Sequence, residues 1–479
     1  MISELTDDDL APIRRALARF EISPNTKPND LIDIDRVFFP DGHRGVLDLR
    51  RQLVVGNRGM GKSFWTHALT NSAVRDQLAR AYSFPKLAQT KVIIGFNGSV
   101  KISGITPTIE EIQRLQNAGN SPELIWQAVI LRATRSLLPP STGLSLLETL
   151  NQLKADPGIY ATELTVVDDA EASSGGSILI VFDALDRFSH EWGPIRELTK
   201  GLMRTIVGLQ SFNSIRTKVF MRVDQFADRD LFRFPDSSKI LNDRVDLTWR
   251  AHELYGLLLF ELLRDSDASQ ALKYLAKRLH VEAALPTKGR MNAGFEQQES
   301  LITAVAGEYM GKDRKRGRVY TWVPLHLGDA ANNCSPRTFL TAWKTAAEHL
   351  PSPQGLAVDH LGLNEGVRQA STARLNELRE DYPWIDLALE PLRRQFVPIP
   401  RDDLFELWRE KDVSKSIRET AGLAPIGVFI EDSPTALLQT MTSIAVMEER
   451  ANGKINVPDI FRVEAEILRR GGVAVPRRS

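Results

Sequence analysis

The sequence has a single cysteine, Cys334, in 479 residues. One thiol excludes an intramolecular disulfide framework and a cluster of thiolates around a metal, and it is typical of a protein in a reducing compartment. The chain also has no excess of charge, because 61 Lys and Arg residues balance 61 Asp and Glu residues. A net charge of zero gives no whole-molecule attraction to nucleic acid or to an anionic membrane, so any such contact must come from a local patch.

Long apolar runs are also missing. No stretch approaches the roughly 18 apolar residues of a membrane span, and the N-terminus is acidic where a signal peptide would be basic. The eight histidines show no metal-ligand spacing. We therefore expect a cytoplasmic protein with no membrane attachment.

Apolar segments of strand length alternate with helical patterns in the first half of the chain. Alternation of this kind predicts an α/β fold whose mostly parallel sheet is covered by helices on both faces. The stretch 139–177 between two such segments is rich in turn-forming and acidic residues, and we expect an insertion or a mobile loop there. The strand-like segments are 51–56, 91–100, 177–183, 217–222 and 243–249.

The second half of the chain has few strand-like segments. From 250 to about 395 the pattern is helical, and near the C-terminus a helix precedes two strand-like segments about an Asn452-Gly453 turn, a strong hairpin signal. A helix followed by a hairpin suggests a winged helix. The predicted domains are an N-terminal extension (1–48), an α/β core (49–250), a helical lid and linker (251–397) and a winged-helix-like domain (398–479).

The stretch "GNRGMGKS" matches the phosphate-loop pattern G-x-x-x-x-G-K-[ST], and it lies between a predicted strand and a predicted helix. Glycines let backbone amides converge on phosphate oxygens, and the helix adds its positive N-terminal end. We expect Lys62 to reach the β- and γ-phosphates and Ser63 to ligate Mg²⁺. The residues predicted to hold ATP are Gly56, Asn57, Arg58, Gly59, Met60, Gly61, Lys62, Ser63 and Phe64.

The segment "ILIVFDALDR" ends a predicted buried strand with acidic residues. Asp183 is placed to hold Mg²⁺ opposite Ser63. Many ATPases carry glutamate directly after this aspartate, but here the next residue is Ala184. Asp186 is the nearest carboxylate for a general base, and a helix-capping role is an equal alternative.

Two side chains follow the neighbouring strands. Arg222 ends "KVFMR" and is predicted to sense the γ-phosphate; a surface arginine is the alternative. Asn97 ends "KVIIGFN", where orienting a water molecule and forming a turn are the two interpretations.

The order of these motifs resembles the additional-strand division of P-loop NTPases, in particular the AAA+ and STAND classes, which include origin-recognition-type and bacterial defence ATPases. The D-x-x-D-R form is closer to STAND and KAP-type proteins. "CSPRTFLTAW" is similar to a lid helix of such enzymes, and the resemblance implies that Arg337 contacts the γ-phosphate. The missing glutamate after Asp183 departs from AAA+ enzymes and implies slow turnover.

A basic run at 311–318 offers a second type of contact. It is predicted to bind nucleic-acid phosphates or an acidic partner, or else to be a solvated loop. The C-terminal region (398–479) carries similar numbers of acidic and basic residues, which weakens DNA binding as its main role and leaves protein contact open. The basic residues of the run are Lys312, Arg314, Lys315, Arg316 and Arg318.

These patterns predict an ATPase that uses ATP and Mg²⁺ as a molecular switch controlling the assembly or activity of a partner, with slow or partner-stimulated hydrolysis. By resemblance, the setting is a bacterial anti-phage defence complex and the protein is a homo-oligomer or part of a hetero-complex. Two alternatives stay open. One is a DNA-associated ATPase, a loader or DNA-processing subunit. The other is a scaffold that binds ATP with little hydrolysis.

Overall fold

The computed structural model describes residues 6–22, 37–101, 104–137, 143–188, 192–291, 295–420, 433–470 and 473–475. The chain divides into two compact units. Residues 43–247 form one of them, which we call the nucleotide unit; residues 6–22, 37–42 and those from 248 on form the other, the helical unit. No helix within these described residues is long and apolar enough to cross a membrane.

The nucleotide unit is built on a five-stranded sheet in the order β2-β3-β4-β1-β5, and every pair in it is parallel. β1 and β3 are not neighbours, because β4 lies between them. The strands are β1 (Leu53–Val55), β2 (Thr90–Phe96), β3 (Ser177–Phe182), β4 (Ile215–Met221) and β5 (Val245–Asp246).

The register of this sheet aligns the carboxyl ends of its strands. Val55 lies opposite Met221 of β4 and Asp246 of β5, while Phe182 lies opposite Val219 of β4 and Phe96 of β2. The loops that follow β1, β3 and β4 therefore begin at the same edge of the sheet.

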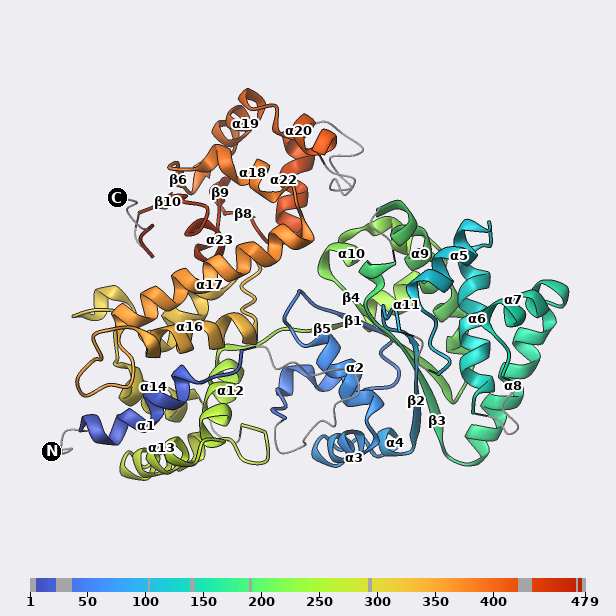
Figure 1. Cartoon of the computed structure of the whole chain (residues 1–479), viewed down its shortest axis with the longest axis horizontal. Helices are drawn as coiled ribbons and strands as arrows, with labels where there is room; N and C mark the ends of the chain where they lie inside the picture. The colour runs from blue at the N-terminus through green and yellow to red at the C-terminus, as the bar shows by residue number, and fades with distance from the viewer. Residues whose placement is uncertain are drawn as a thin grey trace. The chain divides into compact units, whose positions relative to one another are not determined.

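Helices cover both faces of this sheet, as its buried strands require. Figure 1 shows α2, α3 and α4 on one side and α5 to α8 on the other. The helices of this unit are α2 (Lys62–Thr70), α3 (Ser72–Ala81), α4 (Pro85–Ala88), α5 (Ile109–Asn117), α6 (Pro122–Arg135), α7 (Leu146–Ala155), α8 (Gly158–Ser173), α9 (Trp192–Gly208), α10 (Val223–Ala227) and α11 (Ser237–Asn242), with short 3₁₀ turns η3 (Leu185–Arg187), η4 (Leu209–Ser211) and η5 (Arg229–Phe232).

The core of the nucleotide unit follows the two-residue period of the strands. In β3, Ile178, Ile180 and Phe182 face one buried cluster together with Trp126 of α6. The Trp126 indole also donates to the carbonyl of Leu198 at 2.8 Å, so its polar atom is satisfied inside the core. This packing fixes β3, and with it the position of the residues that follow the strand.

For the stretch 139–177, of which 143–177 are described, the structure corrects the mobile-loop alternative and leaves the insertion alternative as a prediction. The stretch contains two helices, α7 and α8, which pack on α6. Asp168 of α8 is buried and accepts hydrogen bonds from the backbone N–H groups of Asn213, Ser214 and Ile215, where β4 begins. The segment is therefore a structural part of the nucleotide unit, held by its own carboxylate to the sheet.

The helical unit contains the predicted helical region. Its boundaries differ from the predicted domains, because α1 packs on α13 and α16, and because 251–397 and 398–475 belong to the same unit. Its helices are α1 (Asp7–Ala18), α12 (Ala251–Leu263), α13 (Ser266–Arg278), α14 (Phe295–Ala306), α15 (Val319–Leu327), α16 (Pro336–Glu348), α17 (His360–Asp381), α18 (Ile385–Leu389), α19 (Arg401–Glu410), α20 (Val413–Thr420), α22 (Pro434–Ser443) and α23 (Asp459–Arg462), with 3₁₀ turns η6 (Glu282–Ala284), η7 (Arg314–Arg316) and η8 (Glu390–Leu392); η2 (Asp41–Leu47) spans the boundary between the units.

The helices α16 and α17 pack at very close range. A Cβ atom on Gly366 of α17 would lie 2.2 Å from the carbonyl oxygen of Ala342 in α16, and one on Gly362 would lie 2.6 Å from that of Ala346. Only glycine permits this approach. The two helices therefore form one tightly packed pair.

The end of the chain has the predicted helix followed by a hairpin. β8 (Glu448–Glu449) and β9 (Lys454–Asn456) pair antiparallel about the turn at Gly453, and β7 (Ile399–Pro400) completes a three-stranded sheet. β6 (Phe396–Val397) pairs in parallel with β10 (Leu468–Arg469). The hairpin prediction about Asn452-Gly453 is therefore confirmed.

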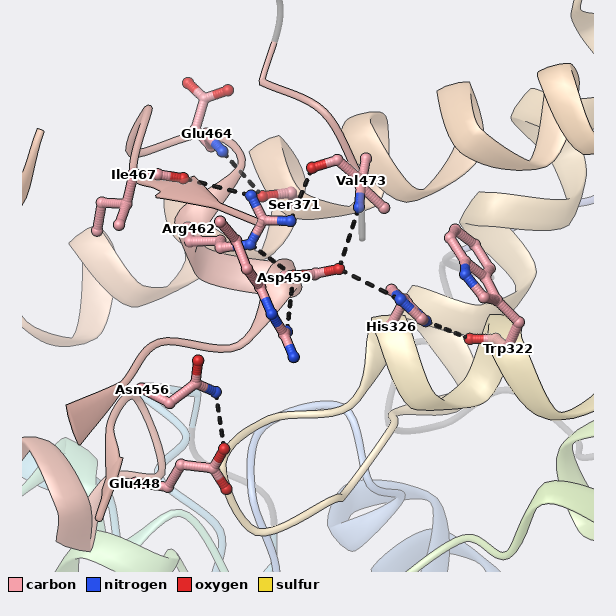
Figure 2. Close-up of polar contacts among 11 residues, drawn as sticks. Trp322, His326, Ser371, Glu448, Asn456, Asp459, Arg462, Glu464, Ile467 and Val473 are labelled. Atoms are coloured by element: carbon pink, nitrogen blue, oxygen red, sulfur yellow. Dashed lines mark hydrogen bonds and ion pairs between the residues drawn. The ribbon is translucent and has the colours of Figure 1, made fainter. Parts of the chain in front are cut away.

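A buried ionic network joins α15 to this C-terminal region (Figure 2). Asp459 accepts a hydrogen bond from Arg462 Nε at 2.5 Å, and its other oxygen lies 3.5 Å from His326 Nε2 of α15. Arg462 also donates to the carbonyls of Ile467 and Val473. Because breaking a buried pair leaves an uncompensated charge, this network ties the last strands to the helices before them.

Lys218 of β4 is a fully buried cation in the nucleotide unit. Its ammonium donates to the carbonyls of Asp48 at 2.8 Å and Arg51 at 2.6 Å. Burial lowers the pKa of Lys218 to about 7, against the opposing effect of Asp48. In the unfolded chain a lysine titrates at about 10.4, so above pH 7 the unfolded state binds a proton that the folded state lacks. Stability therefore rises with pH in this range.

We expect Lys218→Met to remove this pH dependence. Between pH 7 and pH 9, the free energy of unfolding of the wild type should rise relative to that of Lys218→Met by about 2 kcal/mol, as the shift from about 10.4 requires. Urea denaturation of both proteins at both pH values measures the difference. The two carbonyls lose their donor equally at each pH, so that cost cancels. A difference that is the same at pH 7 and pH 9 would contradict the lowered pKa.

Candidate nucleotide-binding site

The loop after β1 has the backbone of a phosphate-binding loop. Gly59 and Gly61 have φ angles of 80° and 106°, in the region that glycine adopts without strain. A Cβ atom on Gly56 would lie 3.0 Å from Leu247 Cβ, so a larger residue there would crowd Leu247. Met60, within the loop, is buried. Gly59 and Gly61 are thus placed where the backbone conformation favours glycine.

Helix α2 begins directly after the loop, at Lys62, with Gly61 as its N-cap. Gly61 has no side chain to cap the helix, so the N–H groups of the first turn remain directed out of its N-terminus. Such a terminus attracts anions through these N–H groups and through the helix dipole. The predicted strand, glycine loop and helix are all confirmed.

The side chain of Lys62 folds back over the loop. Its ammonium donates to the carbonyls of Gly56 at 2.8 Å and Asn57 at 3.0 Å. Asp183, Arg222, Asp186 and Asp224 are the charged groups that act on it electrostatically. The structure thus brings Lys62 together with Asp183, Asp186 and Arg222, three of the other residues predicted from the sequence.

Asp183 follows β3 and is buried. One carboxylate oxygen accepts from the Ala184 backbone N–H at 2.8 Å, and the other accepts from the Thr66 hydroxyl of α2 at 3.0 Å. This hydroxyl connects the acidic strand end to the helix of the phosphate loop. Sequence reasoning missed Thr66; its position one helical turn after Ser63 was the available signal.

Lys62 and Asp183 each lack full compensation for their charge. Burial lowers the pKa of Lys62, with Asp183 opposing. Burial also raises the pKa of Asp183, although the Ala184 N–H, the Thr66 hydroxyl and Lys62 oppose the shift. A phosphate anion beside Lys62 and a divalent cation beside Asp183 would stabilise both ionised forms. The residues present therefore fit a nucleotide with its magnesium ion.

Arg222 follows β4 and holds two carboxylates. Its guanidinium forms a two-point pair with Asp224, at 3.1 Å and 3.0 Å, and donates to Asp186 at 3.3 Å. The surface-arginine alternative is wrong, because the side chain is only 15% exposed. Asp224 was missed by sequence reasoning, although it stands two residues after Arg222 in "MRVD".

The exposure and contacts of four other predicted residues are as follows. Ser63 is exposed and Phe64 is half-buried, with its ring 5.4 Å from that of Trp65. Arg58 is half-buried. The Asn97 side chain accepts from the Ser99 backbone N–H, which is the turn-forming alternative.

Ala184 adopts a left-handed backbone conformation, with φ of 57° and ψ of 39°. Its methyl group faces Gly98, two residues after β2, where an added Cβ would lie 2.9 Å away. The position that many ATPases fill with glutamate is thus a small residue packed against another strand end. Asp186, in η3, is the carboxylate closest in sequence that reaches the charged cluster.

Arg337 and the basic run belong to the helical unit. Arg337 lies in the first turn of α16 and pairs with Glu377 of α17 at 2.9 Å. Arg374 pairs with the same carboxylate. Its contact with the γ-phosphate stays a prediction.

The fold and the site define a class of protein. The sheet is parallel, and β4 lies between the phosphate-loop strand β1 and the acidic strand β3, with Lys62 and Asp183 following the carboxyl ends of these two strands; this is the arrangement expected for the core of a P-loop protein of the additional-strand division. The predicted α/β core with helical domains is confirmed.

Comparisons with known proteins give the following. Two solved structures are similar to this chain: Cdc6p from Pyrobaculum aerophilum, at 14% identity over 95% of each chain with a TM-score of 0.28, and the Aeropyrum pernix ORC2 protein in ADPNP-ADP complexes, at 14% identity over 93% of each chain with a TM-score of 0.29. These low scores add nothing to the strand order and loop described above. No protein-family model and no curated protein matches the sequence.

Thr66 offers a test of the link between α2 and Asp183. We expect Thr66→Val to lower the free energy of unfolding by about 2 kcal/mol, because a buried carboxylate oxygen loses its donor. Thr70→Val is the matched control, since the Thr70 hydroxyl donates only to backbone carbonyls of its own helix. Urea denaturation measures both. In an Asp183→Asn background the cost of Thr66→Val should shrink, and an unchanged cost would show that the two side chains are not coupled.

Proposed function

We propose that the chain is an ATP- and Mg²⁺-dependent molecular switch that hydrolyses ATP slowly and controls the assembly or activity of a partner. The observation that carries the proposal is the grouping of Lys62, Asp183, Asp186 and Arg222 around one helix N-terminus. Phosphoryl transfer to water requires four groups, and these residues offer one of each: a cation (Lys62), a metal-binding carboxylate (Asp183), a candidate base (Asp186) and a candidate γ-phosphate sensor (Arg222).

Each residue has a definite task in this proposal. ATP supplies the phosphoanhydride to be cleaved, and Mg²⁺ neutralises its charge. The N–H groups of residues 56–64 and Lys62 hold the phosphates, and Ser63 and Asp183 hold the metal. Asp186 accepts the proton of the attacking water, and Arg222 binds the γ-phosphate. In the described residues no cluster of three or more His, Cys, Asp and Glu side chains suits a metal, which agrees with a Mg²⁺ site completed by phosphate oxygens.

In the proposal, the helical unit contains the residues that respond to the γ-phosphate. In this scheme, Arg337 contacts the γ-phosphate. Because its guanidinium pairs with Glu377 in this structure, the phosphate has to take the place of Glu377. The C-terminal helices and hairpin act as a winged helix that presents the changed state to a partner. The close packing of α16 on α17 makes this pair suited to move as one body.

The direct test is ATP hydrolysis by the wild type and by single variants under single-turnover conditions. We expect Lys62→Ala to abolish binding of a fluorescent ATP analogue. Asp186→Asn should retain binding and lose at least about 100-fold in rate, the usual range for a general base. The molar mass from light scattering, measured in the same buffers, reports nucleotide-dependent assembly.

Two outcomes would redirect the proposal. If the wild type binds ATP and shows no turnover in any condition, the chain is an ATP-binding scaffold and Asp186 has no catalytic role. If duplex DNA stimulates turnover, the DNA-associated alternative is favoured. Oligomer formation, a cytoplasmic location and a setting in anti-phage defence stay predictions.

One observation supports the DNA-associated alternative. The basic run forms a loop closed by a bridge between Tyr309 and Arg318, and η7 lies at its tip. Arg318 pairs with Glu299 and Glu308, so it serves the loop itself. The remaining four cations are exposed, and none forms an ion pair with another described residue: Lys312, Arg314, Lys315 and Arg316.

We therefore expect Lys315→Glu/Arg316→Glu to weaken duplex binding if DNA is a partner. The slope of log K against log salt concentration should fall by about 2, one unit for each lost phosphate contact. Fluorescence anisotropy with a labelled duplex at several salt concentrations measures the slope. The matched control is Lys411→Glu/Lys415→Glu, which reverses two exposed lysines near α20. Equal effects of both pairs would indicate nonspecific attraction and exclude the loop as a DNA site.

A further inference from the structure

Asp224 holds Arg222 by a two-point pair. The carboxylate meets the guanidinium at two points, Nε at 3.1 Å and Nη2 at 3.0 Å. Two-point pairing of a planar guanidinium with a carboxylate fixes the plane of both groups. The third nitrogen, Nη1, is left for a different partner, and in this structure that partner is Asp186 at 3.3 Å.

The backbone fixes Asp224 in turn. It lies in the first turn of α10, and its carboxylate accepts from the Gln225 N–H at 2.9 Å. The Gln225 side chain accepts from the Arg222 N–H. The side chain of Asp224 is only 10% exposed. The pair is therefore anchored to the start of α10, whereas Asp186, at 33% exposed, is the more accessible partner.

We propose that Asp224 is the positioning residue of the site: it holds Arg222 in place, so that Nη1 of Arg222 exchanges its bond to Asp186 for one to the γ-phosphate. This inference rests on the proposed function. Without a γ-phosphate, Arg222 is bonded to Asp186 and occupies the oxygen with which Asp186 would take a proton. With a γ-phosphate, Arg222 turns its Nη1 to the phosphate, and Asp186 is released.

The chemistry of the released state is balanced. A water oxygen attacks the γ-phosphorus, the bond from that phosphorus to the bridging oxygen breaks, and ADP leaves with the bonding electron pair. Asp186 takes the proton of the water and passes it to the inorganic phosphate. Asp224 touches neither substrate nor water in this scheme, because both of its oxygens face Arg222. Its effect on the γ-phosphate passes through the guanidinium, while its charge also acts on Lys62.

The test separates recognition of the γ-phosphate from hydrolysis. We expect Asp224→Asn to weaken binding of a nonhydrolysable ATP analogue about tenfold, the effect of losing one well-oriented charge-assisted hydrogen bond, and to leave ADP affinity within about twofold. The single-turnover rate should fall further, by about 100-fold. Asp224→Glu should recover part of the discrimination between ATP and ADP, because it restores the anion.

The matched control is Asp230→Asn. Asp230 pairs with Arg196 in the same unit, and it is not among the groups that act electrostatically on Lys62. It should change neither the ATP:ADP affinity ratio nor the rate. In an Arg222→Gln background, Asp224→Asn should have no further effect on the ratio, because the two residues act as one.

The results distinguish this inference from the proposed function. An additive loss in the double variant, or an unchanged ATP:ADP ratio in Asp224→Asn, would overturn the positioning role even if hydrolysis proceeds. A wild type that binds both nucleotides without hydrolysis would defeat the ATPase proposal, while the affinity ratio would still test Asp224. Unchanged ADP affinity and melting temperature show that Asp224→Asn is folded.

Discussion

The charged site depends on one constraint, the side-by-side alignment of β3, β4 and β1 in parallel register. Phe182 lies opposite Val219, and Val55 lies opposite Met221, so the residues that leave these strands begin at a common edge. Asp183, Arg222 and the phosphate loop are therefore neighbours, although more than 160 residues separate the first glycine of the loop from Arg222. A shift of one residue in any pair would turn the following side chain to the other face of the sheet.

Burial then sets the chemistry of that edge. Lys62 and Asp183 lie where water is scarce, so the ionised form of each is disfavoured and each relies on the other, on the Ala184 N–H and on the Thr66 hydroxyl. The charges of Lys62 and Asp183 are poorly compensated by the protein alone. A polyanion with a divalent cation would compensate both of them. Under the proposed function, nucleotide binding and the stability of this edge of the sheet would be two consequences of the same electrostatics.

The sequence predicted the parts of this site that local chemistry specifies. Glycine spacing and Lys62 identify the phosphate loop, because few other backbones need glycine at those positions. An apolar run ending in Asp183 identifies the acidic strand. Thr66 and Asp224 were not predicted. Thr66 acts through Asp183, which is distant in sequence, and Asp224 acts through a loop geometry that no sequence motif describes. The helices α7 and α8 escaped because turn-forming and acidic residues dominate a stretch whose apolar positions bind α6 only in the folded state. The pairing of Arg337 with Glu377 joins residues 40 positions apart and depends on the α16–α17 packing.

The absence of glutamate after Asp183 can be understood from the backbone. Ala184 takes a left-handed conformation, which costs any residue other than glycine, and its methyl group packs against Gly98. A glutamate there would meet both restrictions, so a base has to come from elsewhere in the cluster. Asp186 is in place, but it shares Arg222 with Asp224, so one of its oxygens is occupied by a guanidinium N–H. Under the proposed function, hydrolysis at this site would be conditional on the partner of Arg222, and that condition suits a switch, in which the lifetime of the bound state matters more than the rate of turnover.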